Sequence, residues 1–161
     1  MAYRYAIRQM HTQTQIQISQ DRNQRYAEAL QSAWHLLQYM SPTENQHAIL
    51  QFERTGKGKD AQEQYYIHIP NAQRFIQEIL PQVFYQQHSG LFWTPELKGI
   101  VFEYRSILYG FCLKEKGSTS QRVLIENAEL VSKFKTDYEQ MQDLLKNELS
   151  NLYRKSNDLQ F

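Results

Sequence analysis

Cysteine is almost absent from this chain of 161 residues, with Cys112 as its single thiol. One cysteine excludes an intramolecular disulfide and a cysteine-ligated metal cluster. The longest nearly unbroken apolar run, residues 107–113, is far shorter than the roughly 20 residues that cross a bilayer. The first residues lack the apolar segment of a signal peptide, and no Asn-x-Ser/Thr acceptor is present. These absences predict a cytoplasmic protein that contacts no membrane. Cys112 falls near an apolar helical stripe, and we expect it to be a buried, inert thiol.

Proline, glycine and net charge are also scarce, with four prolines, six glycines and a formal net charge of +1. No segment is rich enough in Pro, Gly or Ser to separate two domains, and no internal repeat is evident. We therefore expect residues 1–161 to form a single domain. The near-neutral charge gives the whole chain no reason to bind nucleic acid or a membrane surface. We expect neither a metal nor a cofactor.

Apolar and aromatic residues are well supplied, at 41% apolar residues with eleven tyrosines and eight phenylalanines. This composition is typical of a globular domain with a real core. The chain also contains 21 glutamines, which are scattered through periodic segments and do not form a prion-like tract. We interpret them as side chains in positions where other proteins carry Glu or Lys.

Alternation of apolar and polar residues predicts strands in several parts of the chain. Residues 3–18 alternate with one change of phase, which predicts an extended segment with a bulge. Residues 47–54 and 65–69 alternate on either side of a loop at 55–60, and this arrangement predicts an antiparallel hairpin. Residues 123–125 predict a short edge strand.

Helical spacing of apolar residues predicts helices between these strands. Asp21 is expected to cap the first helix, which ends before Pro42. Asn71 is expected to cap the second, and Pro81 should kink or break it. Each prediction rests on a capping residue followed by an apolar stripe.

Two further helices are expected in the second half of the chain. The third helix is expected to have Thr94 as its cap and Pro95 at its first position. Gly99 and Gly110 share one face of this helix, which predicts close packing against another element. Asn127 is expected to cap a long fourth helix. Together the elements predict an α+β fold, a small antiparallel sheet of three to four strands packed on one face by helices, with a long C-terminal amphipathic helix.

The apolar stripe of this last helix approaches the spacing of a coiled-coil seam, although packing on the sheet explains it about as well. If the helix extends beyond the core, the stripe is a surface for a protein partner or for a homodimer. Its candidate partner-binding residues are Phe134, Tyr138, Met141, Leu145, Leu149 and Leu152.

Polar residues of the predicted hairpin share the face that points away from the helices. Simple pairing across the loop sets Glu53 near Tyr66 and Gln51 near His68. With His47, the residues Glu53 and His68 form a candidate catalytic set for a hydrolase or nuclease. The alternative is the ordinary solvated side of an antiparallel sheet. No His-Glu-x-x-His or Gly-x-Ser-x-Gly motif supports catalysis.

Basic residues in the loops give a second kind of candidate site. The segment at 56–59 lacks the spacing of a phosphate-binding loop, but as a basic hairpin tip it could contact a phosphate backbone. Tyr65, Phe92 and Trp93 are possible stacking partners. The candidate nucleic-acid-binding residues are Arg54, Lys57, Lys59, Tyr66, Lys114, Lys116 and Arg122. Simple solvation of the basic loops is the alternative.

Because no catalytic signature is present, the sequence favours a small non-catalytic binding or adaptor protein. Its partner would be a nucleic acid bound through the basic loops or a protein bound through the C-terminal helix. A hydrolase or nuclease with its site on the sheet face is the alternative.

Overall fold

The computed structural model describes residues 2–43, 45–117 and 119–158. Its helices and strands are α1 (Ala2–Met40), β1 (Leu50–Thr55), β2 (Gln62–His68), α2 (Ile69–Arg74), α3 (Pro95–Lys114), β3 (Arg122–Leu124) and α4 (Ala128–Asp158). The strands form an antiparallel sheet in the order β1-β2-β3. The predicted α+β class, the hairpin, the edge strand and the long C-terminal helix are confirmed.

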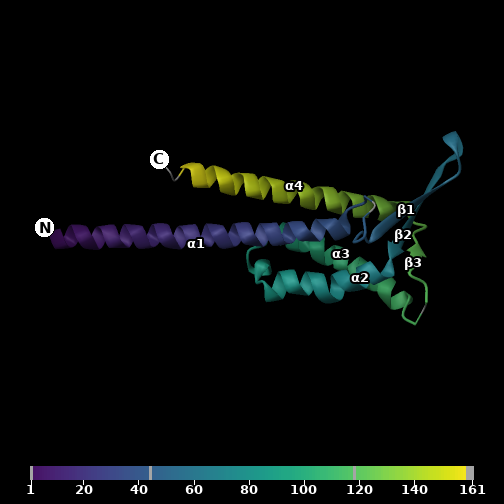
Figure 1. Cartoon of the computed structure of the whole chain (residues 1–161), viewed down its shortest axis with the longest axis horizontal. Coiled ribbons are helices and arrows are strands. Elements are labelled where there is room, and N and C mark those ends of the chain that lie inside the picture. Colours follow the sequence, from purple (N-terminus) through teal and green to yellow (C-terminus); the bar gives the residue numbers. More distant parts are fainter. Residues whose placement is uncertain (1, 44, 118, 159–161) are drawn as a thin grey trace.

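The longest elements, α1 and α4, lie side by side and run in opposite directions (Figure 1). The core lies where the C-terminal half of α1 meets α3, α4 and one face of the sheet. Tyr104 of α3 lies edge-on to Phe75 and Phe134, with ring centroids 5.7 and 5.1 Å apart. These edge-to-face contacts hold the helices at fixed positions around the buried rings.

The strand predicted for residues 3–18 is wrong, because this segment is the first half of α1. The segment contains neither proline nor glycine, so nothing stops the helix from propagating through it. The hydroxyls of Thr12 and Thr14 donate to the carbonyls of Arg8 and Met10 one turn earlier. Asp21 therefore lies within a continuous helix and is not a cap.

Two expectations for the second helix also change. His68 caps α2, with its Nδ1 accepting a hydrogen bond from the Asn71 backbone N–H, so the helix begins before Asn71. Pro81 does not break the helical path, because π-helical turns at Phe75–Ile79 and Gln82–Gln86 flank it. Such turns accommodate a residue that lacks the backbone N–H.

The other caps are as predicted, while the prediction for two glycines is wrong. Thr94 accepts a hydrogen bond from the Leu97 N–H at the start of α3, and Asn127 accepts one from the Glu129 N–H at the start of α4. A side chain at Gly99 or Gly110 would meet open space. The close approach occurs at Gly90, where a methyl group would overlap the Phe84 ring.

The register of the hairpin differs from the expectation by two residues. Gln51 pairs with Tyr66, and Glu53 pairs with Gln64. The reason is that the turn centres one residue earlier in the chain, through a short 3-10 turn at Gly58–Asp60. A shift of two residues keeps every side chain on its face. The predicted polar residues therefore still share one face of the sheet, although their pairing differs.

The hairpin is buried at its base and exposed at its tip, which projects from the body of the molecule (Figure 1). Leu50 and Ile67 are buried at the base, whereas Phe52 is 37% exposed. Within the described residues, no helix is long and apolar enough to cross a membrane.

Candidate functional site

The outer face of the sheet gathers several of the predicted polar residues. Gln51, Tyr66, His68 and Arg122 line one shallow hollow. Arg122 donates to the Glu53 carboxylate, and its guanidinium carbon lies 4.7 Å from the centroid of the Tyr66 ring. Burial lowers the pKa of His68, whose ring accepts the capping hydrogen bond of α2. The hydrogen bonds of this face stabilise the sheet and the start of α2.

His47 does not join that face. It lies before β1, its ring centroid is 5.3 Å from that of Tyr39, and it lines a separate hollow beside Trp34 and His35. The structure thus brings Glu53 and His68 to one surface without His47. In the described part of the chain, no three His, Cys, Asp or Glu residues are placed to hold a metal ion.

Two of the predicted nucleic-acid-binding arginines form ion pairs with carboxylates within the sheet. Arg54 pairs with Glu63 at 3.1 Å, and Arg122 pairs with Glu53. Exposed ion pairs of this kind contribute little stability, but they reduce the charge offered to a phosphate. Tyr66 is covered by Arg122 on one side of its ring.

The four predicted lysines remain exposed. Lys57 and Lys59 lie at the projecting hairpin tip, and Lys114 and Lys116 lie at the end of α3 and in the turn after it. Within residues 2–43, 45–117 and 119–158, no ion pair involves Lys57 or Lys59. The same holds for Lys114 and Lys116, so all four lysines carry charge that no ion pair among the described residues compensates.

The predicted stacking residues are largely engaged within the fold. Trp93 is 3% exposed and donates to the Ala29 carbonyl at 3.4 Å, while Phe92 is half-buried. Tyr65 accepts a hydrogen bond from Lys135, whose ammonium lies 4.4 Å from the ring centroid.

Burial raises the pKa of half-buried Cys112, consistent with an unreactive thiol.

The predicted partner-binding stripe of α4 packs inside the chain. Phe134, Met141, Leu145 and Leu152 are buried, and Tyr138 and Leu149 are half-buried against the core. Since the stripe contacts α1 and α3, it is not a free surface in this structure. The helix that does extend beyond the core is α1.

The N-terminal half of α1 is the largest exposed feature that the sequence did not predict. Every side chain from residue 3 to residue 22 is exposed. We call residues 3–18 the arm; it continues past the described end of α4 (Figure 1). Its most exposed large apolar side chains are Tyr3 (79%), Met10 (67%), Tyr5 (66%), Ile18 (62%) and Ile16 (52%).

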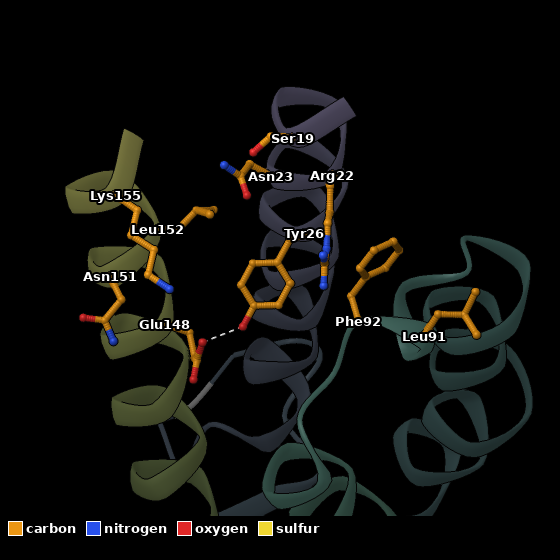
Figure 2. A pocket seen from close by; sticks show the side chains of 10 residues that line it. All are labelled: Ser19, Arg22, Asn23, Tyr26, Leu91, Phe92, Glu148, Asn151, Leu152 and Lys155. Atoms are coloured by element: carbon orange, nitrogen blue, oxygen red, sulfur yellow. Dashed lines mark hydrogen bonds between the residues drawn. The ribbon is translucent and has the colours of Figure 1, made fainter. Parts of the chain in front are cut away.

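A hollow of about 570 Å³ lies at the base of the arm, between α1, α4 and the segment at 89–92. Tyr26 stands in its middle and donates its hydroxyl hydrogen to the Glu148 carboxylate (Figure 2). Burial, together with the hydrogen bond and charge of Glu148, raises the pKa of Tyr26 to about 12. The phenol therefore stays protonated and holds Glu148 in place.

A buried polar pair lies between α3 and α4. The Tyr104 hydroxyl and the Asp137 Oδ2 atom have no hydrogen-bond partner among the described residues, and these side chains are 0% and 4% exposed. The other carboxylate oxygen of Asp137 accepts a hydrogen bond from Lys133 at 3.3 Å. Burial raises the pKa of Asp137, against the opposing effect of the Lys133 charge.

Comparison with known proteins gives no family for this chain. No protein-family model matches the sequence, and no curated protein is similar to it at a significant level.

Proposed function

We propose that this chain is a small non-catalytic binding protein that assembles through its arm, with a second copy of the chain as the partner. The observation that carries the proposal is that α1 extends well beyond the body with all of its arm side chains exposed. Tyr26 faces Glu148 in antiparallel helices, so the described end of α4 reaches about residue 16 of α1. Roughly 20 Å of α1 then lies beyond α4.

The composition of the arm supports a protein partner. It contains two tyrosines, a methionine and two arginines but no Lys, Glu or Asp. Tyr, Met and Arg are enriched in the cores of protein interfaces, while Lys, Glu and Asp are depleted there. An isolated helix of this length is marginal in water, and the arm carries four β-branched residues in its last seven positions. Contact with a partner would stabilise it.

One face of the arm is complementary to itself in an antiparallel pair. The apolar side chains of this face, together with Thr14, recur at intervals of three and four residues, at Tyr3, Ile7, Met10, Thr14 and Ile18. Antiparallel pairing that sets Met10 opposite Thr14 of the other copy places Ile7 within one residue, about 1.5 Å along the axis, of Ile18. Symmetric dimers of this kind are the commonest oligomers.

Charge favours the antiparallel orientation over the parallel one. Arg4 and Arg8 lie near one end of the arm, and Asp21 follows its other end. Antiparallel pairing places Arg4 near Asp21 of the second copy. It also separates the arginines of the two copies by roughly 12 Å or more along the axis, beyond the screening length of about 8 Å at physiological salt.

The mass of the full-length chain in solution tests the proposal. Light scattering after size exclusion, at loading concentrations of about 10 to 200 μM, should show a dimer for the wild-type chain. Replacing two residues of the pairing face, Ile7→Gln with Met10→Gln, should give a monomer whose circular dichroism shows a folded body. The matched control is Ile16→Gln on the opposite face, which should remain dimeric. A wild-type monomer throughout, or loss of the dimer in the control alone, would overturn the proposal.

A second candidate function is nucleic-acid binding at the hairpin tip. It is favoured by Lys57 and Lys59, which project at the tip without ion pairs among the described residues. Titration of fluorescent single- and double-stranded DNA and RNA at about 50 and 200 mM salt should show affinity that falls steeply with salt. Changing both lysines to Gln should weaken binding. Unchanged affinity in that variant would remove this function.

A further inference from the structure

The hollow at the base of the arm has the size of a small-molecule site. Its volume of about 570 Å³ falls within the range of roughly 300 to 1,000 Å³ that is usual for ligand pockets. Three segments far apart in the sequence form its walls: α1, the segment at 89–92, and α4. The hollow is therefore a product of the tertiary fold.

The side chains that line the hollow carry more positive than negative charge. Arg22 of α1 and Lys155 of α4 both line it, and their side chains flank the Tyr26 ring from opposite sides (Figure 2). Neither cation takes part in an ion pair within the described residues. Glu148 is the one acid among the lining residues, and it accepts the hydrogen bond from Tyr26. An anion in the hollow would thus be attracted by two cations that are not in ion pairs.

The same hollow offers apolar surface and neutral donors beside the cations. Phe92 and Leu152 line it, and Leu91 at its edge is 79% exposed. Ser19 and Asn23 add a hydroxyl and an amide on the α1 side. Ligand sites commonly combine apolar walls with a few convergent polar groups that fix orientation.

We propose that this hollow binds a small ligand with an anionic group on an apolar body. One of the two cations, Arg22 or Lys155, holds the anionic group, a phosphate or a carboxylate, through charge-assisted hydrogen bonds, and the other attracts it from the opposite side of the Tyr26 ring. Phe92 and Leu152 contact the apolar body. Glu148, held by Tyr26, disfavours a second negative charge on that side of the ring.

Isothermal titration of the full chain with four probes tests this site. Phenyl phosphate and benzoate carry both required features, inorganic phosphate lacks the apolar body, and benzyl alcohol lacks the charge. We expect at least one aromatic anion to bind with Kd below about 1 mM, and both single-feature probes to bind at least about tenfold more weakly. The aromatic anion with the lower Kd shows whether the site prefers a phosphate or a carboxylate.

Variants assign the binding to the hollow. Arg22→Gln and Lys155→Gln should each weaken binding of the preferred probe about tenfold. The control Lys146→Gln removes a positive charge from α4 outside the hollow and should leave the affinity unchanged. Binding should persist in the Ile7→Gln, Met10→Gln variant, which separates this site from arm pairing. Wild-type affinity in both the Arg22→Gln and the Lys155→Gln variant, or no binding of either aromatic anion, would overturn the proposal.

Discussion

The hydroxyl of Tyr104 should destabilise the folded chain, so Tyr104→Phe should make the protein more stable. The side chain is 0% exposed, and its hydroxyl has no hydrogen-bond partner among the described residues. Burying such a group without a partner costs about 1 to 3 kcal/mol. The substitution removes that cost and keeps the ring, so the edge-to-face contacts with Phe75 and Phe134 remain.

We expect the free energy of unfolding to rise by about 1 kcal/mol, the lower end of that range, because a core relaxes around the change. For a domain of this size the melting temperature should rise by roughly 2 to 4 °C. Urea unfolding followed by circular dichroism measures the change, with an unchanged m value as the sign that the unfolded state is unaffected.

The matched control is Tyr109→Phe, which lies in the same helix with 51% of its side chain exposed. Removing this hydroxyl should change the stability by less than about 0.5 kcal/mol. A loss of stability of 1 kcal/mol or more in Tyr104→Phe, with a neutral control, would refute the reasoning. It would show that the hydroxyl is hydrogen-bonded in solution, for example through a water molecule shared with Asp137.

Three further predictions concern stability. Burial raises the pKa of Asp137, so this carboxyl group keeps its proton to higher pH in the folded state than in the unfolded state. The stability of the wild-type chain should therefore fall relative to that of Asp137→Asn as pH rises from about 4, the ordinary pKa of an Asp carboxyl. Urea unfolding between pH 4 and 7 measures this difference. Gly90→Ala should lower the free energy of unfolding by about 1 to 3 kcal/mol, because the new methyl group overlaps the Phe84 ring. Gly99→Ala places its methyl group in open space and should raise the free energy of unfolding by up to about 1 kcal/mol. Thermal melts measure both changes. Thr94→Ala should cost about 1 kcal/mol by removing the cap on the Leu97 N–H, and Thr94→Ser should restore most of the loss.

Elements with both a cap and a clear period were predictable from the sequence. Thr94 and Asn127 begin α3 and α4 as their residue types suggest, and the hairpin follows from two alternating runs around a glycine-containing loop. Its register was not predictable, because the glycines at 56 and 58 permit more than one turn geometry. Local chemistry specifies the turn residues but does not by itself specify the pairing.

The first half of α1 was mispredicted because alternating Ile, Thr and Gln residues resemble a strand. Two signals in the sequence indicate the helix instead. No proline or glycine occurs before Pro42, and Tyr3, Ile7 and Met10 already follow helical spacing. β-propensity is a weak preference that helix continuity overrides here.

The candidate site could not have been predicted from spacing. Arg22 and Lys155 lie near opposite ends of the sequence, and they line the same hollow because α1 and α4 pair in antiparallel orientation with Tyr26 facing Glu148. The predicted catalytic set failed to assemble for a related reason, since the position of His47 depends on how the chain turns between α1 and β1. Contacts between distant segments are set by packing, which one sequence does not reveal.

Amide hydrogen exchange of the wild-type chain, at about 5 and 200 μM, tests the role of the arm most directly. If the arm pairs with a second copy, amides at residues 3–18 should exchange more slowly at the higher concentration, while the body should show equal protection at both. Fast exchange of the arm at both concentrations would mean that it finds no partner in another copy and would contradict the proposed assembly.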